Sequence, residues 1–315
     1  MNDGFGRRIK YLRLSVTDLC QLRCQYCMPA EGVRKIEHSD ILSVEECIEM
    51  ARACAALGVT KVRLTGGEPL VRRGITDICA GIAAIPGVEE LCLTTNAVLL
   101  EKYAAQLRDA GVTRLNISLD TLDAEKYRRI TRVGDIETVF RGLDAADSAG
   151  FEHTKINCVL MGGVNDDEIR DMIGLTRERE IEVRFIELMP IGECAGWDEA
   201  RFIPGSTVLD RAPELREEGV SGVTTVYRMP GYAGTVGLIS PMSHKFCSGC
   251  DKIRITSDGL LKPCLHSADE IPLRGRHGEA LEAAIRDAIM SKPQSHLMQE
   301  GRHSDSLRGM SGIGG

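Results

Sequence analysis

Hydrophobic and polar positions recur with two different periods along the first two thirds of the chain. Short runs with a period of two, typical of strands, alternate with longer stretches that carry the helical period. Such alternation is the sequence form of repeated strand–helix units with a parallel sheet. Six strands are predicted, at residues 11–16, 59–65, 90–95, 114–120, 155–160 and 182–188. The pattern predicts an α/β fold, a partial (β/α)6 TIM-like barrel rather than a closed barrel of eight strands.

Local signals mark the ends of the first helix between these strands. Ser43 and Glu46 have the spacing of a capping box at a helix N-terminus. Gly58 suits the position just after the end of the same helix, where a left-handed backbone is common.

The predicted strands carry polar and basic residues on one face, which is unusual for a parallel sheet. Parallel strands covered by helices normally read as nearly continuous apolar runs, because both faces are buried. Here Arg13, Lys61, Arg63, Lys155 and Arg184 alternate with apolar residues. Successive side chains of a strand point to opposite faces, so the barrel interior is predicted to be polar and basic. Buried cations are costly without anions or water, so we expect a negatively charged ligand there; the alternative is that some of these residues reach solvent at strand ends.

The barrel pattern ends after Gly192, and a different arrangement follows. A helix is predicted near residues 207–215, strands at 223–227 and 235–239, a turn at 257–259 between strands at 253–256 and 260–263, and a helix near 277–291. We expect three parts: a barrel at residues 1–192, a C-terminal α+β lobe at 193–292, and a flexible tail at 293–315 rich in Ser, Arg and Gly.

Composition narrows the class of protein. Of 315 residues, 43% are apolar and 27% are charged, as in ordinary globular proteins. The net charge of −7 argues against a nucleic-acid binder, which needs a basic surface. Without a signal segment or an apolar run of bilayer length, we expect a cytoplasmic protein that does not bind membranes. The 12 cysteines are then expected to be metal ligands and buried thiols rather than disulfides.

Two clusters of three cysteines stand out from the others. Cys20, Cys24 and Cys27 lie in a short loop after the first strand, and Cys247, Cys250 and Cys264 lie in the C-terminal lobe. Both a [4Fe–4S] cluster and a structural zinc ion take four ligands, so each triad leaves a metal position open for a small molecule. Buried free thiols or a zinc knuckle remain alternatives for the first triad. For the second, zinc with His266 or His244 as fourth ligand remains open.

The first triad, with its spacing Cys-x3-Cys-x2-Cys, resembles that of the radical S-adenosylmethionine (SAM) superfamily. The run Thr65-Gly66-Gly67-Glu68-Pro69 after the second strand matches a SAM-binding segment of the same superfamily. With the second triad, the whole chain resembles the molybdenum cofactor biosynthesis protein A family, the GTP 3′,8-cyclases. The further matching motifs are Asn116-Ile117-Ser118-Leu119-Asp120, Gly163-Val164-Asn165-Asp166, Arg184-Phe185-Ile186-Glu187-Leu188-Met189 and the terminal Gly314-Gly315.

The resemblance implies a radical SAM lyase with two [4Fe–4S] clusters and SAM as cofactors. In this family a 5′-deoxyadenosyl radical abstracts hydrogen from C3′ of GTP, and the product is (8S)-3′,8-cyclo-7,8-dihydroguanosine 5′-triphosphate, the first step of molybdenum cofactor biosynthesis. The implied partners are a flavodoxin- or ferredoxin-like electron donor, the downstream cyclic pyranopterin monophosphate synthase, and a second copy of the chain in a homodimer. The resemblance implies that the cofactor carries out the radical chemistry, so no side chain is assigned a catalytic role.

The family's site residues carry over where motifs match. Cys20, Cys24 and Cys27 would hold the SAM cluster, and Cys247, Cys250 and Cys264 the second cluster, whose open iron binds guanine. SAM positions are Tyr26, Gly67, Ser118 and Met189. GTP positions are Arg13, Arg63, Thr94, Lys155, Arg184, Lys252 and Arg254, with Lys61 adjacent. Gly314 and Gly315 end a tail that the family uses in its active site.

Four positions depart from the family pattern. Leu19 and Gln21 stand where Arg and Asn are usual, Ala97 replaces a usual Gly, and Lys252 replaces a usual Arg. Lys252 keeps the charge but loses the bidentate fork of arginine, so weaker triphosphate binding is expected.

Two other kinds of protein remain as alternatives. A radical SAM enzyme that modifies peptides would also carry a cysteine-rich domain after the barrel, but it has less need for a basic interior. A zinc-stapled, non-catalytic protein would explain both triads and leave the basic residues without a ligand.

Overall fold

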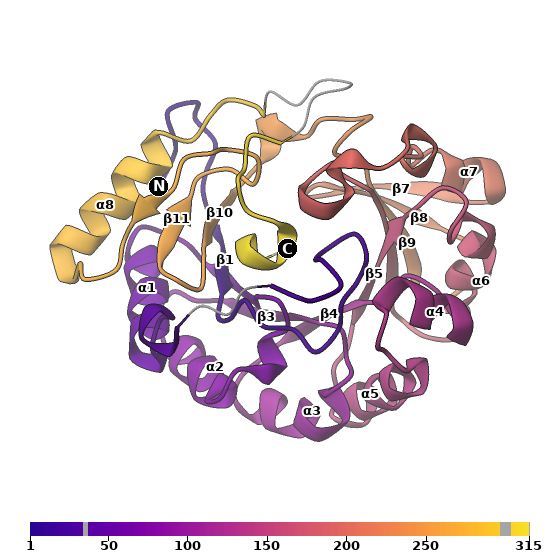
Figure 1. Cartoon of the computed structure of the whole chain (residues 1–315), viewed down its shortest axis with the longest axis horizontal. Coiled ribbons are helices and arrows are strands. Elements are labelled where there is room, and N and C mark those ends of the chain that lie inside the picture. The colour runs from indigo at the N-terminus through magenta and orange to yellow at the C-terminus, as the bar shows by residue number, and fades with distance from the viewer. Residues whose placement is uncertain (34–36, 297–303, 315) are drawn as a thin grey trace.

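The computed structural model describes residues 1–33, 37–296 and 304–314, and the twelve strands found there join one sheet. The strand order is β12-β11-β10-β1-β2-β3-β4-β5-β6-β9-β8-β7. Figure 1 shows this sheet curving around a central space, with the C-terminal end of the chain inside the curve. The bounds of the strands are β1 Tyr11–Ser15, β2 Lys61–Thr65, β3 Glu90–Thr95, β4 Arg114–Ser118, β5 Lys155–Leu160, β6 Glu182–Glu187, β7 Arg216–Ser221, β8 Thr224–Arg228, β9 Thr235–Ile239, β10 Lys252–Ile255, β11 Leu260–Lys262 and β12 Ile271–Pro272.

The predicted partial barrel is confirmed, and the C-terminal strands extend it on both sides. Strands β1 to β6 pair in chain order, all parallel. Beyond them, β9 pairs parallel with β6 and β10 pairs parallel with β1. The antiparallel strands β8 and β7 continue one edge, and β11 and β12 the other. Strands from either side of residue 192 therefore share one continuous sheet.

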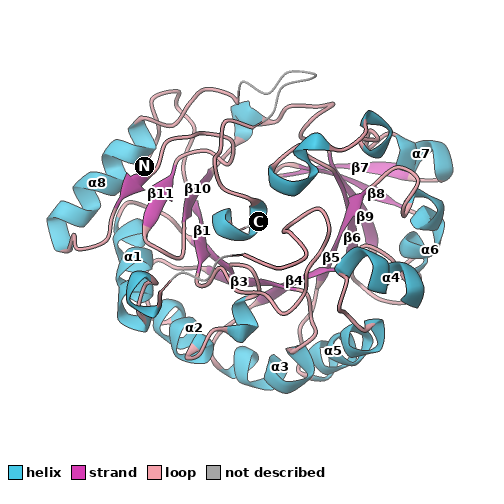
Figure 2. Ribbon diagram, in the orientation of Figure 1, coloured by secondary structure: helices cyan, strands magenta, loops and turns pink. Residues whose placement is uncertain are grey.

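Helices cover the outer face of the sheet, as Figure 2 shows. Their inward faces pack on the apolar face of the strands, where Leu12, Val62, Leu93, Ile117 and Phe185 are buried. The helices are α1 Val44–Ala56, α2 Ile75–Ala83, α3 Leu100–Asp109, α4 Ala124–Thr131, α5 Ile136–Ser148, α6 Ile169–Gly174, α7 Thr207–Arg211, α8 Gly278–Met290 and α9 Met310–Ile313.

The register of the strands puts the polar residues on the opposite, inner face. Arg13 on β1 is in register with Arg63 on β2 and with Arg254 on β10. The apolar neighbours in the same strands belong to the outer core, in keeping with the period of two.

Most local predictions hold, but one C-terminal helix is shorter than predicted and one C-terminal strand was missed. Ser43 and Glu46 form the predicted capping box, and Gly58 has a left-handed φ of 92°. The helix expected at 207–215 is wrong in length, because α7 ends at Arg211 shortly before Pro213, which cannot donate a backbone hydrogen bond. The strand β7 was not predicted because its residues are mostly exposed and charged, so it has no apolar face to give alternation.

In the parts of the chain that the structure describes, none of the helices has the length and apolar character needed to cross a bilayer.

We predict that Ser43→Ala lowers the free energy of unfolding by about 1 kcal/mol, because it removes the hydrogen bond from the backbone N–H of Glu46 to the Ser43 hydroxyl. Chemical denaturation measures the change. Ser206→Ala is the matched control: Ser206 precedes α7 without a side-chain capping bond, so its unfolding free energy should stay unchanged. Equal effects of the two substitutions would contradict this account of the helix end.

Candidate active site

One cavity of about 390 Å³ lies inside the curve of the sheet, and both cysteine triads line it. Its wall includes residues at the carboxyl ends of the parallel strands, where barrel enzymes build their sites. The predicted SAM residues Tyr26, Gly67, Ser118 and Met189 all line it. So do four of the predicted GTP residues, which are Arg13, Thr94, Lys252 and Arg254.

The loop with the first triad is held by backbone contacts to the end of α4. The N–H of Arg23 donates to the carbonyl of Thr131 at 3.0 Å, and that of Gln25 to Ile130 at 2.9 Å. Arg132 follows α4 with a positive φ of 66°. Its guanidinium donates to the carbonyls of Arg23 and Met28 at 3.0 and 2.9 Å. Arg132 therefore anchors the loop, although it lies far from the loop in the sequence and was not predicted to belong to the site.

The Gly66-Gly67-Glu68 segment packs directly on the entrance to this loop. A Cβ at Gly66 would lie 2.4 Å from the carbonyl oxygen of Thr17, and one at Gly67 would lie 2.5 Å from that of Leu19. The N–H of Gly67 also donates to the Thr17 carbonyl at 2.9 Å. The glycines are therefore needed for contact between two backbone segments, in addition to any contact with a ligand.

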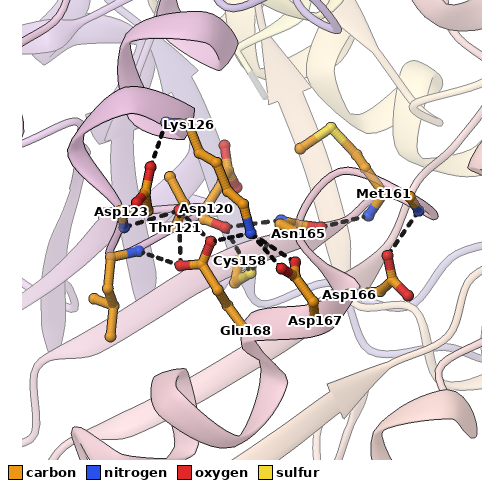
Figure 3. A network of polar contacts seen from close by, with 12 residues as sticks. Asp120, Thr121, Asp123, Lys126, Cys158, Met161, Asn165, Asp166, Asp167 and Glu168 are labelled. Atoms are coloured by element: carbon orange, nitrogen blue, oxygen red, sulfur yellow. Dashed lines mark hydrogen bonds and ion pairs between the residues drawn. The ribbon is translucent and has the colours of Figure 1, made fainter.

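A buried polar network holds Tyr26, which lies between two cysteines of the first triad. The Tyr26 hydroxyl donates to Asp120 Oδ2 at 2.8 Å, and the N–H of Val159 donates to Oδ1 at 2.9 Å. Burial raises the pKa of Asp120 to about 6, against these hydrogen bonds, which lower it. Asn165 donates to the carbonyls of Asp120 and Val159, so the two family motifs that contain Asp120 and Asn165 form one structure (Figure 3).

Glu168 extends this network toward α4. Its carboxylate accepts from the Thr121 hydroxyl and the Leu122 N–H, each at 2.7 Å, and pairs with Lys126 at 2.7 Å (Figure 3). The loop after β4 is thereby tied to the segment after β5.

The second triad is held from both ends of the chain. Arg7 donates to the carbonyl of Cys247 at 2.9 Å. Lys292, only 3% exposed, donates to the carbonyls of Lys252 and Pro263 at 2.9 and 2.6 Å. Burial raises the pKa of the Cys250 thiol, but the charge of Lys292, a backbone hydrogen bond from Lys252 and the charge of Lys252 together outweigh burial, and the pKa is lowered. Lys292 therefore favours the thiolate form that binds metal.

Glu187, at the end of β6, fixes the loop that leads to Cys247. Its carboxylate accepts from the backbone N–H groups of Gly205, Met242 and Ser243 at 2.7, 2.9 and 3.0 Å, and from the Ser243 hydroxyl. Glu187 is 2% exposed, so these donors supply the stabilisation that a buried carboxylate needs.

The two triads fit iron–sulfur clusters better than single ions. All 12 cysteines are free. Burial raises the pKa of Cys20 to about 11 and that of Cys27 to about 12, so thiolates there need a bound cation. Across the residues that the structure describes, no three His, Cys, Asp or Glu side chains gather around a point where one metal ion could sit. A cluster has four irons and spreads its thiolates over them, whereas zinc draws four ligands to about 2.3 Å.

Arg13, Lys252 and Arg254 line the same cavity as both triads, and with Arg63 on the neighbouring strand they form a basic layer on the inner face. Burial, then the charges of Arg254 and Arg63, lowers the pKa of Arg13 to about 9. Lys252 lies 5.5 Å from the centroid of the Tyr11 ring, as does Arg63. This concentration of positive charge is an environment for an anion such as a phosphate chain.

The remaining predicted basic residues are paired with acidic residues of the same inner face. Lys61 lies 2.5 Å from Glu90, which also pairs with Arg114 at 3.0 Å. Lys155 lies 2.7 Å from Glu182, and Arg184 pairs with the same carboxylate. The side of the cavity toward β5 and β6 is therefore closer to neutral than the side toward β1 and β10.

The tail enters the cavity from the open side of the barrel. Arg308 makes a double contact with Asp258, at 3.1 and 2.7 Å, and a third with Glu270 at 2.8 Å. Beyond it, Met310 and Ser311 line the cavity, and Arg254 donates to the carbonyl of Gly314 at 2.9 Å. Gly315 lies outside the described residues.

Several residues of this site were not identified from the sequence. Asp120 and Glu187 lie inside quoted motifs, so a buried carboxylate at the end of a barrel strand was an available signal. Glu90, Glu182 and Lys292 are ordinary charged residues in the sequence and become important only through contacts with distant segments.

We predict that Glu187→Gln lowers the iron content of the reconstituted protein by about half, because the loop before Cys247 loses its charged acceptor while the first triad keeps its own loop. Iron analysis after anaerobic reconstitution measures it. Glu193→Gln, at an exposed position, is the control and should leave iron content unchanged. Full iron content in Glu187→Gln would show that this carboxylate does not support the second triad.

Comparisons with known proteins agree with this geometry. The family model described as Radical SAM superfamily matches residues 14–176, and that described as Molybdenum Cofactor Synthesis C matches residues 181–298. Proteins named GTP 3′,8-cyclase from Alkaliphilus oremlandii and Peptoclostridium acidaminophilum are each 48% identical to the chain. The matches cover 100% and 99% of this chain and 100% and 98% of the relatives. One from Geobacter sulfurreducens is also 48% identical, over 99% of both chains.

Among solved structures, the similarity extends to the fold alone. Streptococcus suis SuiB bound to S-adenosylmethionine matches with a TM-score of 0.56 at 15% identity, over 89% of this chain and 68% of SuiB. Native anSMEcpe with bound AdoMet matches with a TM-score of 0.57 at 14% identity, over 90% of this chain and 82% of that chain. The full-length sequence identity decides the family: the chain belongs to the radical SAM superfamily and, within it, to the family of GTP 3′,8-cyclases.

Proposed function

We propose that this chain is a GTP 3′,8-cyclase, which converts GTP to (8S)-3′,8-cyclo-7,8-dihydroguanosine 5′-triphosphate in the first step of molybdenum cofactor biosynthesis. The observation that carries the proposal is 48% identity over the full length of the chain to a protein named GTP 3′,8-cyclase, together with one cavity lined by both cysteine triads and by the basic residues Arg13, Lys252 and Arg254. A peptide substrate would not need that basic layer.

The first triad serves the cofactor in this proposal. Cys20, Cys24 and Cys27 hold a [4Fe–4S] cluster, and Tyr26, Gly67, Ser118 and Met189 surround SAM. When bound, these groups supply the 5′-deoxyadenosyl radical that abstracts hydrogen from C3′ of GTP. Asp120 keeps Tyr26 in place, and the buried walls of the cavity keep water from the reacting atoms.

The second triad and the basic layer serve the substrate. Cys247, Cys250 and Cys264 hold a second cluster with an open position for guanine, and Arg13, Arg63, Lys252 and Arg254 neutralise the triphosphate. Thr94 lies beside them in the cavity wall, and Lys61, Lys155 and Arg184 act together with Glu90 and Glu182. The contribution of these residues is orientation, because alignment of C3′ decides which hydrogen is removed.

The proposal extends to partners, compartment and domains. A flavodoxin- or ferredoxin-like protein supplies the electron, cyclic pyranopterin monophosphate synthase takes the product, and the enzyme is a homodimer. Free thiols that must bind iron favour the cytoplasm, a reducing compartment. The division into a barrel at 1–192, a substrate lobe at 193–292 and a tail at 293–315 is part of the same proposal.

Product analysis under strict anaerobiosis tests the function. With a low-potential reductant, SAM and GTP, the iron-loaded chain should form 5′-deoxyadenosine together with the cyclised triphosphate. Cys24→Ala should abolish both, while Cys47→Ala, in the buried face of α1, should not. Deoxyadenosine without a GTP-derived product would remove the substrate assignment, and zinc without iron after reconstitution would favour the zinc-stapled alternative.

The role of the tail is tested by deletion. Without residues 314 and 315, turnover of GTP should fall at least tenfold, because Gly314 contacts Arg254 in the basic layer, while iron content stays intact. Leu307→Ala is the control, since Leu307 is 94% exposed in the same tail. Unchanged turnover after the deletion would refute a role for the tail.

A further inference from the structure

The side chain of Asn96 reaches a cysteine of the first triad. Asn96 follows β3, is 9% exposed, and donates from its amide Nδ2 to Cys20 Sγ at 3.6 Å. The backbone N–H of Leu22 donates to the same sulfur at 3.3 Å. Cys20 Sγ therefore receives two N–H donors, one of them from a residue distant in the sequence.

The orientation of this amide is determined by its other contacts. The backbone N–H of Val98 can only donate, and it lies 3.1 Å from Asn96 Oδ1. Gln21 Nε2 donates to the same oxygen at 3.0 Å. With Oδ1 occupied by two donors, the NH2 group must be the end that faces the sulfur.

The backbone around Asn96 is held as firmly as its side chain. Glu68, which is 1% exposed, accepts from the Asn96 N–H at 2.7 Å and from the Thr95 hydroxyl at 2.8 Å. Ala97 has a φ of 64°, and its N–H donates to the Thr95 hydroxyl oxygen at 3.0 Å. Contacts with Gln21, Val98 and Glu68 thus hold Asn96, which donates to Cys20. All of these contacts are made within the chain, so the position of Asn96 does not depend on a bound ligand.

We propose that Asn96, oriented by Gln21 and Val98, is a positioning residue that raises the reduction potential of the first cluster. The inference rests on the proposed function, since it takes Cys20 as a cluster ligand. The cluster gains one electron from the donor protein and no bond is made or broken. A hydrogen bond to a ligand sulfur stabilises the added negative charge of the reduced state more than the oxidised state, and so makes reduction easier.

One departure from the family pattern takes part in this contact. Gln21 stands where Asn is usual, and its longer side chain reaches Asn96 Oδ1. In this chain the residue after Cys20 therefore acts on the cluster through Asn96.

A redox titration of the iron-loaded full chain, followed by electron paramagnetic resonance, tests the proposal without GTP. In Asn96→Leu, the ratio of reduced to oxidised first cluster at the wild-type midpoint should fall about tenfold, which is 59 mV for one electron. The first cluster is recognised by the change that SAM makes in its signal. The second cluster in the same molecule is the internal control, and its midpoint should not move.

Two further measurements separate tuning from a general loss of structure. Electron–nuclear double resonance in D2O should detect an exchangeable proton near the first cluster in the wild type that weakens in Asn96→Leu. Gln21→Met should shift the midpoint in the same direction by a smaller amount, because Val98 still holds Asn96.

An unchanged midpoint in Asn96→Leu with full iron content would overturn the proposal. If that variant does not load the first cluster, Gln21→Met decides, and an unchanged midpoint there overturns it as well. A chain that shows the shift but forms no product from GTP would keep this inference and lose the cyclase proposal.

Discussion

The structure depends on bringing buried basic side chains and two cysteine triads together in one cavity. Arg13 is in register with Arg63 and Arg254 on the neighbouring strands, and burial together with the charges of these two residues lowers its pKa to about 9. The thiols of both triads share the cavity, and burial raises the pKa values of Cys20, Cys24 and Cys27, so a bound cation is needed to hold these three as thiolates. The partly buried carboxylates of Glu90 and Glu182 pair with Lys61 and Lys155, so the excess of positive charge is greatest toward β1 and β10.

The same constraint explains why so much of the supporting structure is polar. Tyr26, Asn96 and the loop before Cys247 are each held by a buried carboxylate: Asp120, Glu68 and Glu187. Burial raises the pKa of Glu68 to about 7, so its three hydrogen bonds do not fully offset the loss of water. These carboxylates fix the positions of the site residues they bind, and burying them lowers the stability of the fold. Such a cost is expected at a site where the positions of side chains matter for function.

Much of the barrel could be predicted because its signals are local. A period of two needs only a few residues, and it separated the basic face of β1 and β2 from the apolar face correctly. The cysteine triads are equally local. What could not be predicted depends on pairing between distant segments. Strand β10 joins β1 across most of the chain, and strand register sets the partners of Lys155 and Lys61. Strand β7 has no alternation of apolar and polar residues from which it could be recognised. The contacts of Lys292 and Arg308 join segments far apart in the chain, and no local pattern indicates them.

The placement of β9 and β10 on opposite edges of the parallel sheet has a mechanical consequence. Residues 240–251, which carry Cys247 and Cys250, connect these two edges across the open side of the barrel. This segment is a tie across an incomplete ring, and its length limits how widely the ring can open. Cys247 and Cys250 are therefore placed by both edges of the parallel sheet at once, whereas the first triad is placed by β1 and by the end of α4.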